Sequence, residues 1–240
     1  ITLDDYQSAS TTWPLTPFSE FLATSFSPGD SSYRPHSFPE AEEDDLAAIL
    51  YTSGTSGYSK AVMLTQKNLA ANALAASQLV SFSPGEVFLS ILPMSHTYEF
   101  TTSFIVPLIN GCRIAYAGKM PTPAILQKLC QHEQPTAIFA VPLIMEKIYK
   151  KRVLPQVERS AMLQFGCRYS FTRKLIYRAI AKKLLDFFGG KLRLMGIGGA
   201  ALNPEVEQFL HEAGFPYLVG YGQTECSPLL AGGPLGDPGI

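Results

Sequence analysis

The chain of 240 residues contains few of the residues that mark metal-binding, disulfide-rich or highly charged proteins. Its four cysteines lie far apart, form no Cys-x-x-Cys pair and have no histidine at ligand spacing, so they indicate neither a zinc site nor a disulfide framework. We therefore expect reduced thiols and a cytoplasmic location. Charged residues make up 16% and sum to a net charge of −1, without an extended Lys/Arg run, which argues against binding to nucleic acid or to an anionic membrane surface.

Long hydrophobic runs are also missing. The longest apolar stretches, 104–109 and 138–145, are too short to span a bilayer and contain proline, and no charged-then-apolar signal opens the chain. We expect a soluble protein, although peripheral contact with a membrane stays open. With 46% hydrophobic residues, the chain is too apolar to be disordered and long enough to bury one core.

The two ends of the chain differ from its middle. Residues 1–43 combine several prolines with scattered aromatic residues, so we expect an irregular lead-in with one short helix near 18–26, followed by a globular part over 44–240. The chain begins with Ile1 rather than Met and stops just after a stretch rich in Gly and Pro. We therefore expect a piece of a longer protein. The oligomeric state cannot be read from the sequence.

Strand-like and helical segments alternate between residues 44 and 240. We expect strands at 46–51, 61–64, 87–92, 112–116, 136–140, 192–197 and 217–219. We expect helices at 101–108, 122–132, 142–151 and 172–188, one that Thr65 caps and that runs to about Val80, and one between Asn203 and Gly214. The basic residues of the 172–188 helix are interpreted as its solvated face. Strands separated by such helices are typical of an α/β fold with a mainly parallel sheet and flanking helices.

The stretch from Tyr51 to Lys60 concentrates glycine and hydroxyl side chains and ends on one lysine. Its glycines let backbone N–H groups approach a ligand closely, and Lys60 supplies a mobile charge for a polyphosphate. It is not a Walker loop, because Ala61 stands where Ser or Thr would bind magnesium, and it is not a Ser-x-x-Lys motif, because Gly57 is three residues before the lysine. From residues alone, both a phosphate-binding loop and a surface loop without function stay open.

Three blocks in order resemble the adenylate-forming, or AMP-binding, superfamily. Thr52 to Lys60, continuing to Leu69, resembles its phosphate loop, Leu92 to Glu99 resembles its acyl-site block, and Gly220 to Glu225 resembles its Tyr-Gly-x-Thr-Glu block. The Tyr98-Glu99 pair and residues 166–173 are similar to the long-chain fatty acid–CoA ligase branch. The loops after 46–51, 192–197 and 217–219 follow strands, and in an open α/β sheet we expect them to meet at the carboxyl ends of the strands.

The resemblance implies a fragment of the large N-terminal domain of such a ligase, with the C-terminal lid domain absent. The implied reaction uses ATP and Mg²⁺ to convert a fatty acid to acyl-AMP and pyrophosphate, and then forms a thioester with CoA. The ribose-binding Asp, the hinge and the catalytic lysine of the lid domain would lie beyond Ile240. We therefore expect the 240-residue piece alone to bind ATP weakly at most and not to turn over.

The resemblance also implies roles for individual residues. The β- and γ-phosphates would be held by Thr52, Ser53, Gly54, Thr55, Ser56, Gly57 and Lys60. Thr224 would contact the α-phosphate, Glu225 would help hold Mg²⁺, Tyr221 would stack on adenine, and Gly199, Ala200 and Ala201 would let the base approach the backbone. Gly222 would belong to the same nucleotide-binding site. The acyl substrate would lie against His96, Tyr98, Phe104, Gly198 and Gly220, and the catalytic residues would be Lys60, His96, Thr224 and Glu225.

Alternatives stay open for the function and for single residues. An acyl-carrier protein could replace CoA, and an aryl or amino acid could replace the fatty acid. A non-catalytic nucleotide-binding module is the alternative from another class, because Ser59, Ala61 and Gln66 stand where the family usually has Pro and Gly and often His. His96 could instead be a structural hydrogen-bonding residue, and the Gly199 turn could serve close packing of a helix on a strand.

Overall fold

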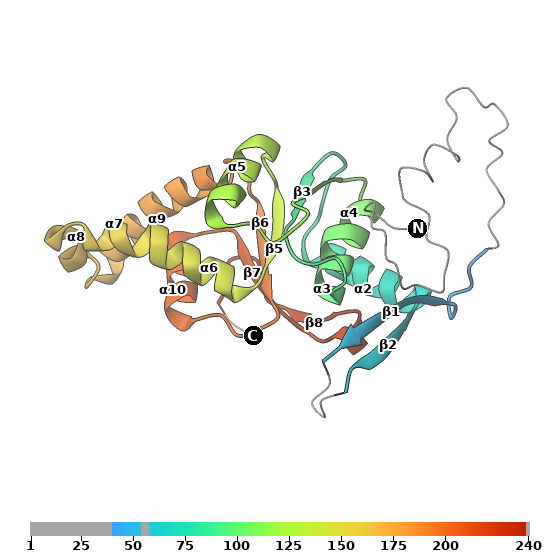
Figure 1. Ribbon diagram of the computed structural model, residues 1–240. Coiled ribbons are helices and arrows are strands. Elements are labelled where there is room, and N and C mark those ends of the chain that lie inside the picture. The colour runs from blue at the N-terminus through green and yellow to red at the C-terminus, as the bar shows by residue number, and fades with distance from the viewer. Residues whose placement is uncertain (1–39, 54–57, 239–240) are drawn as a thin grey trace, which may run out of the picture. The chain divides into compact units, whose positions relative to one another are not determined.

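The computed structural model describes residues 40–53 and 58–238, and from Ala41 onwards these residues form one globular unit (Figure 1). The expected helix near 18–26, and nearly all of the expected lead-in over 1–43, lie outside the described residues and stay predictions. Within the described part of the chain, no helix is long and apolar enough to cross a membrane.

A six-stranded sheet in the order β4-β3-β5-β6-β7-β8 forms the centre of the unit. The strands are β3 (Val87–Ser90), β4 (Arg113–Tyr116), β5 (Ala137–Ala140), β6 (Leu194–Gly198), β7 (Tyr217–Gly222) and β8 (Leu229–Gly232). Neighbours from β4 to β7 pair in parallel, and only β8 is antiparallel to its partner. The predicted α/β class with a mainly parallel sheet is therefore confirmed.

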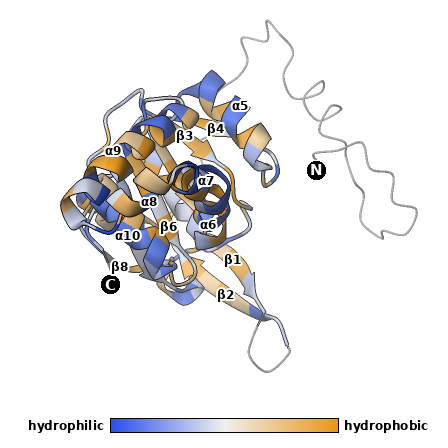
Figure 2. Cartoon of the chain, turned by 90° about the vertical axis from the view of Figure 1, so that its left-hand side faces the viewer, coloured by the Kyte–Doolittle hydropathy of each residue, from blue (hydrophilic) through white to orange (hydrophobic). Residues whose placement is uncertain are grey.

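Helices cover both faces of this sheet. One face carries α5 (Pro123–Glu133), α6 (Pro142–Ile148), α9 (Ser170–Phe187) and α10 (Pro204–Ala213), and the other carries α2 (Gln66–Leu79) and α4 (Val106–Ile109). Successive strand residues enter opposite cores, since Ile138 packs in the first and Phe139 in the second. Figure 2 accordingly shows orange strands and helices along which blue and orange segments alternate.

The strands β1 (Leu46–Thr52) and β2 (Lys60–Thr65) form a separate antiparallel pair in which Thr52 lies opposite Lys60. The predicted connection from strand to strand is confirmed, but the expectation that the 46–51 strand belongs to the main sheet is wrong. A short connection pairs its strands antiparallel, whereas a parallel neighbour requires a long crossover. Thr52 and Lys60, at the turn end of this hairpin, therefore approach the carboxyl ends of the parallel strands without belonging to that sheet.

Helix ends follow local signals. Thr65 accepts a hydrogen bond from the Asn68 N–H, and the Asn68 side chain accepts one from the Thr65 N–H, which completes a capping box for α2. Asn203 caps α10, Pro204 opens it, and Gly214 ends it with a left-handed φ of 66°. Both predicted boundaries are confirmed.

Two predicted helices differ from the observed ones because each contains a π-helical turn. The predicted 101–108 helix begins earlier, as α3 (Thr97–Glu99), η1 (Phe100–Ile105) and then α4. The predicted 142–151 helix continues through η2 (Tyr149–Val153) into α7 (Leu154–Glu158), and α8 (Ala161–Gly166) follows. Pro107 and Pro155 come two residues after these turns. A proline has no backbone N–H, so one helix hydrogen bond is missing, and the wider π-helical turn is compatible with that loss.

Candidate active site

One cavity of about 410 Å³ brings together most of the residues that the sequence singles out. It lies where the ends of β1 and β2 approach the carboxyl ends of β6 and β7 and the turn that follows β7. Its lining includes Thr52, Ser53, Lys60, His96, Tyr98, Gly198, Gly199, Gly220, Tyr221, Gly222, Thr224 and Glu225. Segments far apart in the sequence therefore contribute hydroxyl groups, one lysine and one carboxylate to a single space.

A few predicted residues are not among the lining. Gly54, Thr55, Ser56 and Gly57 lie outside the described residues, so their proposed phosphate contacts stay predictions. Ala200 and Ala201 are exposed, and the cavity reaches only Gly198 and Gly199 of that turn. Three further lining residues were given no role in advance: Gln223 lies inside the Gly220 to Glu225 block, whereas no sequence signal sets Pro228 and Leu229 apart.

Gly198 lies in a closely packed position. A Cβ atom at Gly198 would lie 3.2 Å from the Gly220 carbonyl oxygen and 3.3 Å from Cζ of Tyr98. Tyr98 thus lies directly against the end of β6, in the acyl region that the resemblance implies. Burial raises the pKa of the Tyr98 phenol, which keeps this hydroxyl neutral.

The loop after β7 folds back on itself and carries Thr224 and Glu225. The Gln223 N–H donates to the Pro228 carbonyl over 2.9 Å, and a short helical turn, η3 (Thr224–Cys226), lies between them. A Cβ atom at Gly222 would lie 2.1 Å from the Pro228 carbonyl oxygen, so the loop can close only because this residue has no side chain. β2 runs beside the 224–226 turn.

Asn72 on α2 holds the loop after β7 in place by hydrogen bonds. Its Nδ2 donates to the carbonyls of Cys226 (2.9 Å) and Leu229 (2.8 Å), and its Oδ1 accepts from the Leu229 N–H over 3.1 Å. The Thr101 hydroxyl adds a bond to the Ser227 carbonyl over 2.8 Å. Sequence reasoning missed both residues, because a single Asn or Thr on a helix gives no sign of a partner 157 or 126 residues away.

We expect Asn72→Ala to lower the free energy of unfolding by about 1–3 kcal/mol, because it leaves partly buried backbone groups without partners. Loosening of the Thr224-Glu225 loop should also lower any nucleotide-dependent activity of the whole protein. Asn110→Ala is the matched control, since it removes two Nδ2 hydrogen bonds, to Ser77 and Val106, away from the cavity. Equal activity losses in the two variants would contradict a positioning role for Asn72.

His96 caps the helical segment that begins at Thr97. Its Nδ1 accepts a hydrogen bond from the Tyr98 N–H over 3.2 Å, and the ring is exposed at the cavity wall. A neutral imidazole that accepts at Nδ1 carries its proton on Nε2. The structural role that the sequence left open for His96 is therefore present, and it leaves Nε2–H available to donate to an oxygen in the cavity.

Glu99 is fully buried and holds the segment before His96. One carboxylate oxygen accepts from the Ser90 hydroxyl (2.7 Å) and the Leu92 N–H (3.2 Å), and the other accepts from the Ser103 hydroxyl (3.0 Å). Burial raises the pKa of Glu99 above its ordinary value, although these donors act in the opposite direction. The carboxyl therefore links the end of β3 to η1 beneath the His96 loop.

Glu99 should make the stability of the protein depend on pH. Because its folded-state pKa is raised above about 4.3, its contribution is complete below that pH and is lost as pH rises through the folded-state value. Glu99→Gln can keep the bonds to Ser90, Leu92 and Ser103 without titrating. Chemical unfolding at several pH values should show the wild type losing stability relative to this variant as pH rises. Parallel profiles would contradict the raised pKa.

A second, apolar cavity adjoins the first and shares Tyr98, Gly220 and Leu229 with it. Its other walls come from α2, from the residues just after α2, and from the strands β5, β6 and β7. They include Ala76, Leu79, Val80, Phe82, Phe139, Leu194, Gly196 and Leu218. Phe104, which was expected on the acyl wall, lines a different cavity together with Phe100. Phe104 therefore lies on a different side of this helical segment from Tyr98.

The charges of the main cavity suit a nucleotide with magnesium. Lys60 is its only Lys or Arg among the described residues, and Glu225 is its only carboxylate. Within the described part of the chain, no cluster of three or more His, Cys, Asp or Glu side chains could hold a metal by itself. A single oxygen ligand fits Mg²⁺, which commonly binds through one or two carboxylates and completes its shell with substrate phosphates and water.

A mainly parallel α/β sheet whose carboxyl edge meets Thr52, Ser53 and Lys60 of a β-hairpin over one cavity is the arrangement expected of an adenylate-forming enzyme. The sequence profile described as AMP-binding enzyme matches residues 4–239, and the chain belongs to that family.

Named relatives agree with this assignment. The chain is similar to long chain acyl-CoA synthetase 7, peroxisomal, of Arabidopsis thaliana, with 34% identity over 88% of this chain and 31% of that protein. It is 31% identical to long-chain-fatty-acid–CoA ligase 1 of Cavia porcellus, over 82% of this chain and 30% of that protein. ATP-bound MatB from Rhodopseudomonas palustris aligns with a TM-score of 0.56 and 27% identity, over 80% of this chain and 32% of that chain. The chain thus spans less than a third of the length of these relatives.

Proposed function

We propose that the whole protein activates a fatty acid with ATP, releases pyrophosphate, and transfers the acyl group from AMP to CoA. The observation that carries this proposal is the meeting of Lys60, Thr224, Glu225 and His96 around one cavity in a chain of the AMP-binding enzyme family. The similarity to long-chain acyl-CoA synthetases supports the fatty acid and the CoA thioester.

A free carboxylate is a poor acyl donor because its leaving group would be oxide. In the proposed reaction the carboxylate oxygen attacks the α-phosphorus of ATP, and the bond from that phosphorus to the pyrophosphate oxygen breaks. The CoA thiol, losing its proton, then attacks the acyl carbon and AMP leaves. Such a site works mainly by orienting the reactants and stabilising charge on phosphate oxygens.

The hairpin and the loop after β7 supply groups for the phosphates. Thr52, Ser53 and Lys60 would hold the β- and γ-phosphates, and the Thr224 hydroxyl would donate to the α-phosphate. Glu225 would be the protein ligand of Mg²⁺, which neutralises charge on the phosphates when bound. The ring of Tyr221, 61% exposed at the cavity, would stack on adenine next to the Gly199 backbone.

The acyl substrate would enter from the side of His96 and Tyr98. The Nε2–H of His96 would donate to the carboxylate and orient it towards the α-phosphorus. The first carbons of the hydrocarbon chain would pass Tyr98 into the apolar cavity between α2 and the sheet, whose volume of about 40 Å³ has room for only a short part of the chain unless its walls move. None of the described residues that line that cavity carries a positive charge, which disfavours a second carboxylate at this end of the substrate.

The test supplies the whole protein with ATP, Mg²⁺ and a graded series of fatty acids, an aryl acid and an amino acid, with CoA or an acyl-carrier protein as acceptor. The proposal predicts AMP and acyl-CoA in equal amounts with long fatty acids. Transfer to the carrier protein but not to CoA would assign the acceptor differently, and activity with only the aryl or amino acid would overturn the fatty acid substrate.

A further inference from the structure

A helical extension projects from one side of the sheet. It consists of α7, α8 and the N-terminal half of α9, and α8 lies at the end farthest from the sheet (Figure 1). Arg173 anchors it, because its guanidinium forms two hydrogen bonds of 2.6 Å with the Glu212 carboxylate on α10. The interpretation of all basic residues of this helix as a solvated face is therefore wrong for Arg173, which is structural.

Positive charge is strongly concentrated in this region. Residues 147–183 contain eleven of the 19 Lys and Arg residues of the chain and one of its 20 Asp and Glu residues. The segment therefore carries a net charge of +10 in a chain whose net charge is −1. The net charge of −1, which argued against an anionic partner, is the sum of +10 in this segment and −11 in the rest of the chain.

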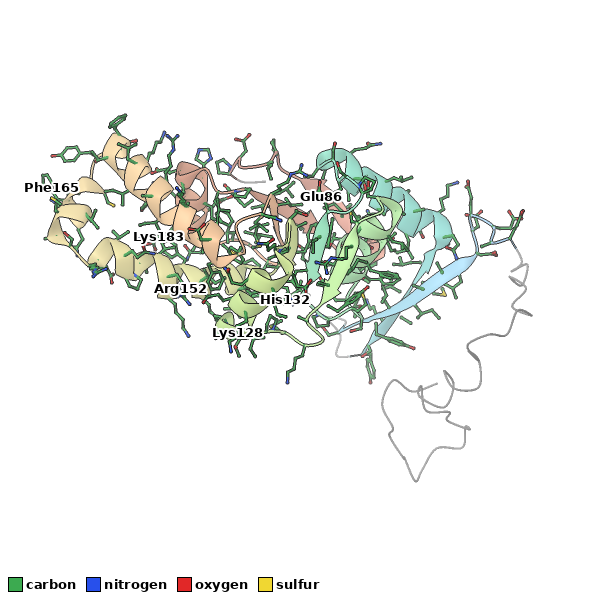
Figure 3. The ribbon with its side chains drawn as sticks, turned by 90° about the horizontal axis from the view of Figure 1, so that it is seen from above. Glu86, Lys128, His132, Arg152, Phe165 and Lys183 are labelled. Atoms are coloured by element: carbon green, nitrogen blue, oxygen red, sulfur yellow. The ribbon has the colours of Figure 1, made fainter. Side chains whose placement is uncertain are left out.

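These cations are available to a partner. Every Lys and Arg of the segment except Arg173 is exposed, and none of these ten takes part in an ion pair with another described residue. Arg152 and Lys183 border a groove between α5, α7 and α9, with Lys128 on the neighbouring helix (Figure 3). Unpaired cations at this density repel one another, which an anionic partner would relieve.

Apolar side chains share the surface with these cations. On α9, positions 171, 174, 175, 178 and 182 fall within about 100° of arc and hold Phe, Lys, Leu, Arg and Lys. At the end of the extension, Met162 is 78%, Phe165 57% and Phe171 76% exposed. The Phe165 ring contacts that of Tyr169 with centroids 5.6 Å apart, and Figure 3 labels Phe165 at the outer end.

We propose that this surface, formed by α8 and the exposed stripe of α9, docks on an anionic membrane. Aromatic and aliphatic side chains at the end of the extension enter the boundary between headgroups and acyl chains, while Lys174, Arg178 and Lys182 bind anionic headgroups. Basic residues interleaved with exposed Phe, Leu and Met are typical of interfacial helices. A polynucleotide would use the cations but gains little from Met162 and Leu175, so lipid is the occupant that explains both features.

The expected energetics follow from the same residues. Each cation near an anionic lipid surface strengthens binding about fivefold, so removing three weakens it on the order of 100-fold at low salt. Burial of two Phe side chains in the interface contributes a further factor of about ten or more. Both parts of the surface are required, because electrostatic attraction and apolar insertion act together.

The test is co-sedimentation of the whole protein with phosphatidylcholine vesicles that contain or lack phosphatidylserine. Lys174→Gln/Arg178→Gln/Lys182→Gln should weaken binding to the anionic vesicles about 100-fold, and Phe165→Ser/Phe171→Ser about tenfold. Matched controls are Lys67→Gln/Lys119→Gln/Lys191→Gln and Leu74→Ser/Leu108→Ser, which change exposed residues elsewhere and should bind like the wild type. Thermal unfolding checks that every variant is folded.

The readout is the difference between matched variants, because other parts of the whole protein can also touch lipid. Equal losses in the charge variant and its control, or no binding of the wild type to anionic vesicles, would overturn the proposal. The surface would instead be assigned to polynucleotides if the protein bound double-stranded oligonucleotides but no vesicles. In that case the binding should depend on the three cations and stay unchanged in Phe165→Ser/Phe171→Ser. None of these outcomes depends on the proposed ligase activity.

Discussion

Lys60→Met in the whole protein should lower fatty acid-dependent ATP–pyrophosphate exchange on the order of 100-fold or more. Lys60 is the only Lys or Arg among the described residues that line the main cavity, so no other side chain there can replace its charge on the leaving pyrophosphate. The change removes the charge and keeps a side chain of similar length. Because Lys60 is exposed at the start of β2, its replacement should alter the free energy of unfolding by less than about 0.5 kcal/mol.

Lys67→Met is the control for this experiment. Lys67 is the second residue of α2, is exposed, and forms an ion pair with Glu43 at 2.7 Å, away from the cavity lining. The Lys67→Met variant should exchange pyrophosphate with ATP at the wild-type rate. An equal loss in both variants, or exchange by Lys60→Met at the wild-type rate, would show that Lys60 does not stabilise the phosphates.

Gly222→Ala should disable the loop that carries Thr224 and Glu225. The new Cβ would lie 2.1 Å from the Pro228 carbonyl oxygen, and because both groups belong to the backbone, no side-chain rotation can relieve the overlap. We expect a loss of about 1–3 kcal/mol in the free energy of unfolding, as for other overpacked sites. Displacement of the two side chains by even about 1 Å should lower exchange on the order of 100-fold.

Gly220→Ala is the matched control for stability, because its Cβ would meet Leu229 Cδ1 at 3.5 Å, an ordinary contact. Chemical unfolding should separate the two variants clearly. If Gly222→Ala were as stable as Gly220→Ala, the closed form of the loop in the structure would be wrong.

Local signals made much of the fold predictable. Caps and glycines act over a few residues, so the boundaries of α2 and α10 could be predicted from Thr65, Asn203 and Gly214. The alternation of strands and helices likewise predicted the parallel sheet. The π-helical turns before Pro107 and Pro155 were not predicted, because periodicity does not distinguish a widened turn from a regular one.

The candidate site was predictable only as far as its motifs extend. The three blocks contain most of the described residues that line the main cavity, but pairing across long sequence distances decides how they meet. The hairpin forms its own sheet, and Asn72 reaches a loop more than 150 residues away, and neither feature follows from local composition. The helical extension was missed for a similar reason, since the net charge of a whole chain hides how its charges are distributed.

Several expectations stay predictions. They are the cytoplasmic location, the limits 1–43 and 44–240 of the two regions, the phosphate contacts of residues 54–57, and the roles of the individual site residues.

The measurement that tests the central claim most directly is isotope exchange between pyrophosphate and ATP by the whole protein, with Mg²⁺ and a long-chain fatty acid but without CoA. Exchange requires reversible formation of acyl-AMP and nothing later in the reaction. The account predicts exchange that depends on both the fatty acid and Mg²⁺ and that Lys60→Met largely abolishes. Tight binding of Mg-ATP without exchange for any carboxylate would contradict it and favour a non-catalytic nucleotide-binding module.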